Sequence, residues 1–140
     1  MRIRSGLGPD LNAVVELWAA AGLAPSFVGF RNELQRKLMR DPDLFLVAEE
    51  GGQVVGALTG GWDGRMPWVS RLAVHPEWRR RGIARRMLQE LRRRLDRHGA
   101  PTEMILVLDD RDAGQNFWES VGYRQSRGYP SYQRVDPAGG

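Results

Sequence analysis

Three arginines and a glycine, in the order Arg79-Arg80-Arg81-Gly82, stand directly before a predicted amphipathic helix. The first backbone N–H groups of a helix have no partner inside it and lie at the positive end of its dipole, so they bind anions. Gly82 has no Cβ to keep an anion from the backbone, and Ala84 keeps the first turn thin. Arg85 and the three arginines add charged hydrogen-bond donors. This spacing predicts a turn that binds phosphate or diphosphate.

Two other interpretations of this segment stay open. An ordinary strand–turn–helix connection with arginines on a solvated face would show the same residues. A basic helix could also meet nucleic acid phosphates, although the arginines fall on several faces and no aromatic residues alternate with them. Other phosphate-binding loops are excluded, because the chain contains neither G-x-x-x-x-G-K-[ST] nor G-x-G-x-x-G.

The size and composition favour one soluble globular domain. The chain has 140 residues, of which 41% are hydrophobic and 27% are charged. We expect the domain to cover residues 1–135 and residues 136–140 to form a loose tail. The net charge of +4 suits an anionic partner such as a phosphorylated cofactor.

Residue types and segments that the sequence lacks exclude some kinds of chemistry and indicate a cellular compartment. The chain has no cysteine, which excludes disulfides, thiolate nucleophiles and cysteine-ligated metals. No apolar run approaches the roughly 18 residues of a membrane-spanning helix, and the first residues do not form a signal peptide. We therefore expect a cytoplasmic protein without a membrane partner. Its two histidines, His75 and His98, fall in a turn and at a helix end, so no metal site is expected.

The elements that must position the basic turn follow from hydrophobic periodicity and turn residues. Asp10 is expected to cap the first helix, and Gly99 to end the helix that follows the basic turn. The fifth strand segment, EMILVL, is a continuous apolar run after Glu103 and predicts a strand buried on both faces. The predicted elements, in order, are a strand at 1–4, helices at 10–18 and 32–39, strands at 44–49, 53–58 and 67–74, a helix at 83–98, a strand at 103–108, a helix at 113–121 and a terminal hairpin at 123–134. This mixture predicts an α+β fold with a mixed sheet and helices on its faces.

The basic turn and its surroundings resemble the GNAT superfamily of N-acetyltransferases. Arg79-x-x-Gly82-x-Ala84 matches the signature [Q/R]-x-x-G-x-[G/A] of that family, and the preceding string LAVHPEWR at residues 72–79 resembles its strand and turn. FWESVGY at residues 117–123 is similar to the later F-Y-x-x-x-G-[F/Y] segment. DLFLVAE at residues 43–49 and the short length further resemble the bacterial YpeA-type members.

The resemblance implies a fold and a cofactor. The fold would be a mostly antiparallel mixed sheet of six to seven strands flanked by about four helices, with a V-shaped opening between the strands at 67–74 and 102–108. Acetyl-CoA would lie in this opening, with its pantetheine arm on the first strand and its pyrophosphate on the basic turn. The backbone N–H of Val74 would be the oxyanion donor for the thioester carbonyl. The implied cofactor-binding residues are Leu72, Ala73, Val74, Arg79, Arg80, Arg81, Gly82, Ile83, Ala84 and Arg85.

Transfer would go directly to an amine acceptor in a ternary complex, because the chain has no cysteine for an acyl-enzyme and no other nucleophile motif. The amine must be neutral to attack, so a base is needed. Asp109 and Asp110, at the end of a strand, are the candidates, with Asp63 and Glu49 as alternatives. Any of these acids would also fit a purely structural role.

The sequence departs from the family at two positions. Trp118 stands where many relatives have a tyrosine that acts as general acid, and Arg111 replaces a common asparagine. Tyr123, Tyr129 or Tyr132 would have to replace that acid, unless the thiolate leaves unassisted. These departures leave open a protein that binds acetyl-CoA as a sensor without turnover.

The acceptor pocket is expected over the first two helices and the loop between them. Phe27, Phe30, Trp62 and Trp68 are its predicted lining and favour an apolar or aromatic acceptor, whereas Trp18 belongs to the core stripe of its helix. Four kinds of acceptor amine fit the sequence equally: a protein N-terminus, a lysine side chain, an amino acid and a small amine. The strand-forming C-terminus permits a homodimer.

Overall fold

A single mixed sheet with helices on both faces forms the fold. The structure is a computed structural model that describes residues 1–23, 29–108, 114–125, 132, 134 and 135. Its strands are β1 (Arg2–Ser5), β2 (Phe45–Glu50), β3 (Gln53–Trp62), β4 (Pro67–Val74) and β5 (Leu106–Leu108). They lie in the order β1-β2-β3-β4-β5, and all neighbours are antiparallel except β4 and β5, which are parallel.

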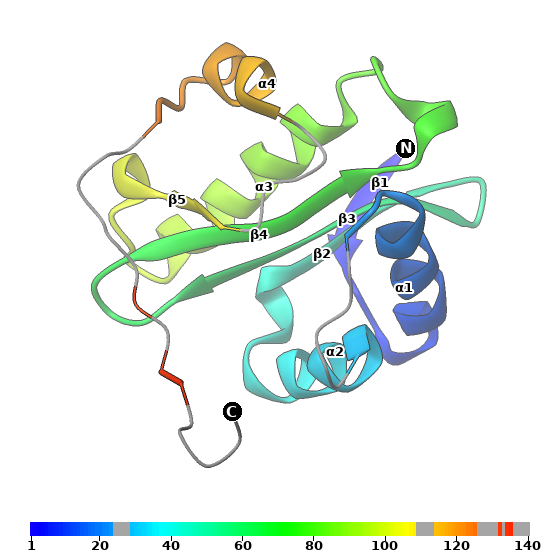
Figure 1. The fold of residues 1–140 in the computed structure, drawn as a ribbon, viewed down its shortest axis with the longest axis horizontal. Helices are drawn as coiled ribbons and strands as arrows, with labels where there is room; N and C mark the ends of the chain where they lie inside the picture. The colour runs from blue at the N-terminus through cyan, green and yellow to red at the C-terminus, as the bar shows by residue number, and fades with distance from the viewer. Residues whose placement is uncertain (24–28, 109–113, 126–131, 133, 136–140) are drawn as a thin grey trace.

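The helices pack in two layers, one on each face of the sheet (Figure 1). The helices α1 (Leu11–Ala20) and α2 (Gly29–Arg40) cover one face, and α3 (Ile83–Arg97) covers the other. The short helix α4 (Gly114–Ser120) follows β5. Four helices and a mixed, mostly antiparallel sheet were predicted, and both predictions are confirmed. Of the helices that the structure describes, none is both long enough and apolar enough to span a bilayer.

The helix α3 connects β4 to its parallel neighbour β5 and fills the core on its face. Its predicted apolar stripe is buried in full: Ile83, Met87, Leu88, Leu91 and Leu95 are each at most 7% exposed. The helix ends where predicted, since Gly99 adopts a φ of 81°. Glycine reaches this left-handed conformation without the steric cost that a Cβ imposes.

The opposite core lies under α1 and α2. Trp18 is fully buried and contacts Phe30 edge to face, with the two ring centroids 5.3 Å apart. The second helix was predicted over 32–39, but it begins at Gly29 and therefore contains Phe30. Phe30 is 2% exposed, so it is a core residue and not the pocket-lining loop residue that the sequence predicted.

The strand β3 is longer than predicted, because two glycines allow side chains to pack on its backbone. A Cβ at Gly60 would lie 2.4 Å from Leu91, and one at Gly61 would lie 2.1 Å from the ring of Trp68. Glycine weakens most strands, which is why the prediction ended this one at Leu58. Here the absence of a side chain is what lets Trp68 lie across β3.

The strand β5 is shorter and less buried than predicted. A 3₁₀ turn at Thr102–Met104 replaces the first half of the expected strand, and Leu108 is 45% exposed. In the described residues β5 is the last strand of the sheet, so only one of its edges is paired. The described sheet accordingly has five strands against the predicted six to seven. The predicted terminal hairpin at 123–134 and the tail at 136–140 fall mainly outside the described residues, while residues 123–125 are not in a strand.

An arginine joins the first strand to the first helix and to the sheet. Arg4 donates to Asp10 at 2.7 and 3.0 Å and to Glu49 at 2.7 and 3.0 Å. The hydrogen bond from Arg4 lowers the pKa of Asp10, against the opposing effect of burial. Asp10 was predicted to cap α1, but it makes no side-chain capping bond to that helix and instead accepts the N–H of Leu7 at 2.8 Å.

We predict that Arg4→Met lowers the free energy of unfolding by about 1–3 kcal/mol at pH 7, because two carboxylates lose a charged donor. The folded pKa of Asp10 lies below the unfolded value of about 3.9, so its contribution is present above that pH and is lost as the pH falls through the folded pKa. Urea unfolding at several pH values should show the gap between wild type and variant shrinking below about pH 4. A gap that does not change with pH would contradict this role.

Candidate active site

The strands β4 and β5 pair at one end of β4 only. The described register runs from Trp68 opposite Leu106 to Ser70 opposite Leu108, where β5 ends. On its other side, β4 stays paired with β3 as far as Val74 opposite Gly56. Ala73 and Val74 therefore have partners on β3, and residues 71–74 have no described strand on the other side. The predicted V-shaped opening corresponds to this segment.

The alternation of a strand fixes which backbone groups face the opening. The N–H of His75 donates to the carbonyl of Val55 on β3 at 2.8 Å. Because successive residues of a strand point their N–H and C=O groups in opposite directions, those of Val74 and Leu72 point away from β3. The carbonyl of Val74 accepts a hydrogen bond from Nε of Arg79 at 3.2 Å. The N–H groups of Leu72 and Val74 are thus directed into the opening.

A cavity of about 500 Å³ follows this edge of β4 to the start of α3. Every predicted cofactor-binding residue except Arg81 lines it, together with Trp78 and Phe117. The guanidinium of Arg81 lies over the ring of Trp78, 4.5 Å from its centroid. Arg81 therefore holds the turn in place from outside the cavity. The lining consists of Leu72, Ala73, Val74, Trp78, Arg79, Arg80, Gly82, Ile83, Ala84, Arg85 and Phe117.

The start of α3 has the geometry of an anion site. The first helical bond runs from the N–H of Arg86 to the carbonyl of Gly82 at 3.1 Å, so the N–H groups of residues 83–85 have no acceptor within the helix. Gly82 has a φ of 76°, and a Cβ placed on it would meet nothing within 4 Å. Arg80 has a φ of 64°, a conformation that costs a residue with a side chain about 1–2 kcal/mol. The open donors and the strained turn fit a bound diphosphate.

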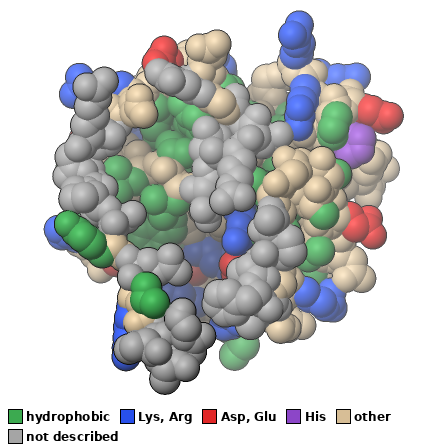
Figure 2. Space-filling view, in the orientation of Figure 1, with side chains coloured by type: hydrophobic (Ala, Val, Ile, Leu, Met, Phe, Trp, Pro, Cys, Tyr) green, Lys and Arg blue, Asp and Glu red, His purple; other side chains and the backbone are tan. Residues whose placement is uncertain are grey.

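A second cavity of about 330 Å³ lies at the other end of the opening, between α2 and the sheet. The predicted acceptor residues Trp62 and Trp68 both line it, as does Leu108 at the end of β5. Phe27 lies outside the described residues. The lining consists of Glu33, Leu34, Arg36, Lys37, Arg40, Asp41, Thr59, Gly60, Trp62, Trp68, Ser70, Arg71 and Leu108. Figure 2 shows Lys and Arg side chains gathered around α2 on this face of the molecule.

Arg71, which was not predicted as a site residue, lines the second cavity directly before Leu72, which lines the first. It has a φ of 55° and lies where the register between β3 and β4 shifts, at a β-bulge. Its guanidinium stacks 4.7 Å from the centroid of Phe30 and forms an ion pair with Glu33 of α2. A signal was present, because Ser70 and Arg71 are consecutive polar residues in an otherwise apolar strand, and a bulge lets both face one side.

The predicted bases separate into two groups. Asp63 and Glu49 have structural roles: Asp63 accepts the N–H groups of Arg65 and Met66 in a turn, which lowers its pKa, and Glu49 binds Arg4. Neither residue lines either of the two cavities. Asp109 and Asp110 lie outside the described residues, as does Arg111. They follow Leu108, which lines the second cavity.

The aromatic residues near α4 pack against the core. Trp118 is 6% exposed, and its indole Nε1 has no hydrogen-bond partner among the described residues. Its ring contacts Phe117 and Tyr123 edge to face at 5.2 and 5.1 Å. An indole N–H is a donor that does not release its proton at physiological pH, so Trp118 does not replace the tyrosine acid of the relatives.

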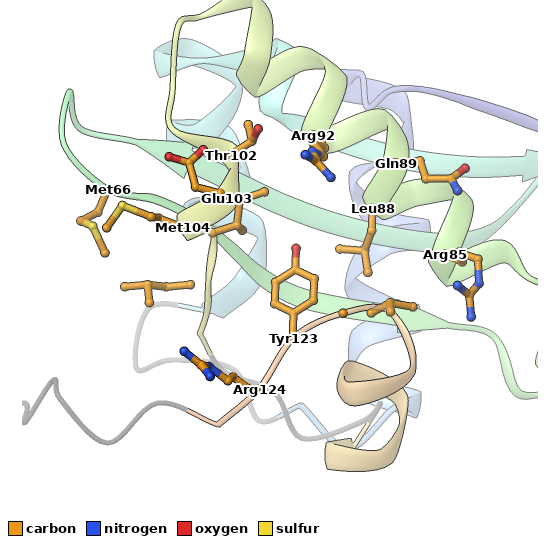
Figure 3. Close-up of a pocket in the computed structure, with 14 residues that line it drawn as sticks. Met66, Arg85, Leu88, Gln89, Arg92, Thr102, Glu103, Met104, Tyr123 and Arg124 are labelled. Atoms are coloured by element: carbon orange, nitrogen blue, oxygen red, sulfur yellow. The ribbon is translucent and has the colours of Figure 1, made fainter.

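Tyr123 belongs to a third cavity, of about 740 Å³, between α3 and β5 (Figure 3). Its ring points between α3 and the 3₁₀ turn that carries Thr102 and Glu103. Burial raises the pKa of the phenol, which makes it a weaker acid. Tyr132 is 94% exposed, and Tyr129 lies outside the described residues. None of the described tyrosines lines the cavity along β4.

Both histidines have structural partners. Nδ1 of His75 accepts the N–H of Glu77 at 3.2 Å, and Nε2 of His98 lies 2.6 Å from Oδ2 of Asp43. Among the described residues, no three His, Asp or Glu side chains gather at a geometry that would hold a metal ion. Two arginines of α3 also have partners: Arg94 binds Ser5 and the carbonyl of Asp43, and Arg93 binds Glu90.

The unpaired edge of β4 and the basic start of α3 line one cavity, and its open donors would suit an extended ligand that carries a diphosphate. The sequence pattern of the acetyltransferase (GNAT) family matches residues 11–123. The chain is 38% identical to an acetyltransferase of Pectobacterium atrosepticum over 123 residues, which is 88% of this chain and 87% of that one. It is 40% identical to an acetyltransferase of Photorhabdus laumondii over 123 residues, with 88% and 86% covered.

Solved structures share the fold at low identity. A predicted acetyltransferase of Clostridium acetobutylicum with acetyl-CoA superposes with a TM-score of 0.72 at 17% identity, covering 94% of this chain and 95% of that one. The aminoglycoside N-acetyltransferase AAC(6')-Iy with CoA superposes with a TM-score of 0.76 at 14% identity, covering 95% and 93%. The chain belongs to the GNAT family of acetyltransferases. As a member of this family, it is an acetyltransferase.

We predict that Gly82→Trp abolishes CoA binding, because the side chain would fill the open space in front of the unpaired N–H groups. Gly99→Trp is the matched control: it lies at the other end of the same helix with a φ of 81°, also without atoms within 4 Å of its Cβ position. Both variants carry a backbone strain of about 1–2 kcal/mol. Calorimetric titration with CoA should separate them, with binding lost only at position 82. Normal CoA binding by Gly82→Trp would show that the diphosphate lies elsewhere.

Proposed function

We propose that the protein transfers the acetyl group of acetyl-CoA directly to an amine acceptor within a ternary complex. The observation that carries this proposal is that neighbouring residues of one strand, β4, line two cavities. The cavity along residues 72–74 reaches the anion-binding start of α3, and the cavity lined by residues 68, 70 and 71 lies beside α2. A donor and an acceptor that occupy them would meet at the boundary between Arg71 and Leu72.

The residues of the first cavity fit acetyl-CoA along its length. The unpaired N–H groups of residues 83–85 and the guanidinium of Arg79 would hold the diphosphate, with Arg80 and Arg85 beside them. The backbone of Leu72 and Val74 would pair with the amides of the pantetheine arm. When bound, acetyl-CoA supplies a thioester whose carbonyl carbon is open to attack by a neutral amine.

A backbone N–H in the opening would stabilise the negative charge that develops on the thioester oxygen. Val74 is the predicted donor, and Leu72 points its N–H in the same direction. Leu72 lies farther from the diphosphate end and nearer the acceptor cavity, which favours it for a group at the far end of an extended arm. A preorganised donor of this kind contributes about 3–4 kcal/mol to transition-state stabilisation.

The acceptor amine must lose a proton before it attacks. Asp109 and Asp110 are the proposed bases, directly or through water, because they follow Leu108 at the wall of the acceptor cavity. Glu33 also lines this cavity, but it is paired with Arg71. The thiolate of CoA can leave without a general acid, since a free thiol has a pKa of about 8.5. Trp118 therefore does not prevent turnover.

Closer kinship with the YpeA-type acetyltransferases and the formation of a homodimer stay predictions. A sensor that binds acetyl-CoA without turnover is the second candidate, favoured by the buried indole of Trp118 at the position of the relatives' acid. Titration with acetyl-CoA, followed by a thiol-release assay over amino acids, peptides and polyamines, distinguishes the two. Thiol release with at least one amine supports the transferase. Binding without release for every amine supports the sensor.

We predict that Asp109→Asn and Asp110→Asn leave CoA affinity unchanged, while at least one of them lowers kcat by about 10²-fold or more, as expected for loss of a general base. Steady-state thiol release and CoA titration measure the two effects separately. Asp63→Asn is the control, because its carboxylate is engaged in a surface turn. If neither position affects kcat, the base lies elsewhere in the acceptor cavity.

A further inference from the structure

The charges that line the acceptor cavity are not balanced in the described residues. Its two acids are both engaged: Glu33 pairs with Arg71, and Asp41 lies 2.8 Å from Nζ of Lys37. Lys37 also donates to the carbonyl of Gly60 on β3. These pairs leave two further cations in the lining, Arg36 and Arg40.

Arg36 and Arg40 form a matched pair on α2. They are four residues apart, so their Cβ atoms lie on one side of the helix at a separation of about 5–6 Å. Both are exposed, and among the described residues neither forms an ion pair. Two guanidinium groups at this spacing present several N–H donors to a single anionic group, which is the geometry that favours carboxylate or phosphate.

The cavity has charged residues of α2 on one side and residues of β3, β4 and β5 on the other. Ser70 and Arg71 line it directly before Leu72, which lines the cofactor cavity, and the proposed bases follow Leu108, another lining residue. The arginine pair stands on α2, which forms the opposite wall. An acceptor with its amine at the β4–β5 opening would therefore place its remaining atoms toward Arg36 and Arg40.

We propose that the acceptor is a primary amine that carries a carboxylate, and that Arg36 and Arg40 bind this carboxylate while the amine faces the opening. This inference rests on the proposed function, because it assigns the acceptor to the cavity beside α2. It also revises the apolar acceptor that the tryptophans favoured: Trp62 and Trp68 would contact the body of the acceptor between its two charged ends.

The carboxylate can come from a free amino acid or from an acidic peptide, and two matched pairs of acceptors separate these sources. The first pair is alanine and alaninamide. The second pair is a peptide amide that begins Ala-Glu and its counterpart that begins Ala-Gln. In at least one pair, the carboxylate member should have a kcat/KM about tenfold or more above its neutral partner. Equal values within about twofold in both pairs would overturn the proposal.

The variant Arg36→Glu/Arg40→Glu tests whether these two residues cause the preference. It should lose the preference for the carboxylate and keep its affinity for CoA. Arg97→Glu is the control, since it removes an exposed arginine of α3 that lines neither cavity. Discrimination that survives in the double variant would overturn the assignment.

A binding measurement keeps this inference separate from the proposed function. The N-acetylated products of each pair are titrated into wild type and the double variant, with CoA present. Tighter binding of a carboxylate product to wild type alone would support the inference even if no amine is acetylated, in which case only the proposed turnover fails. Equal binding of charged and neutral products would overturn the inference whether or not turnover is seen.

Discussion

Hydrogen bonding between β4 and β5 stops at Ser70 in the described residues, and the rest of the site depends on this interruption. Buried backbone N–H and C=O groups require hydrogen-bond partners. A strand edge that lacks a neighbouring strand can therefore accept another extended chain. Here Ala73 and Val74 are paired on the other side with β3. The edge of residues 71–74 therefore has backbone groups without a described strand partner, to which an extended ligand could bind.

The N-terminus of α3 lies close to this edge, because β4, the basic turn and α3 are consecutive segments of the crossover that leads to β5. The turn after β4 leads directly into α3, whose buried stripe packs on the sheet and fixes where the helix begins. The hydrogen bonds from Arg94 to Ser5 and to the carbonyl of Asp43, and the stacking of Arg81 on Trp78, stabilise the same unit. A ligand can thus contact a strand edge and a helix start whose relative position is set by the hydrophobic core.

Local patterns predicted the parts of the site that local forces determine. The periodicity of α3, the glycine at position 82 and the strand at 67–74 are properties of short segments, and the structure has all three. The bulge at Arg71, the burial of Phe30 and the extension of β3 through Gly60 and Gly61 were missed. Each depends on a contact with a residue distant in sequence, such as the rings that stack on Arg71 or the indole of Trp68 that covers Gly61.

The central claim is that backbone amides of β4 and α3 are the groups that receive the cofactor. Amide hydrogen exchange, resolved by residue and measured with and without CoA, tests it most directly. The account predicts slower exchange on CoA binding at Leu72, Val74 and residues 83–85, with little change in β1 or β2. Unchanged exchange at these amides in a protein saturated with CoA would contradict it.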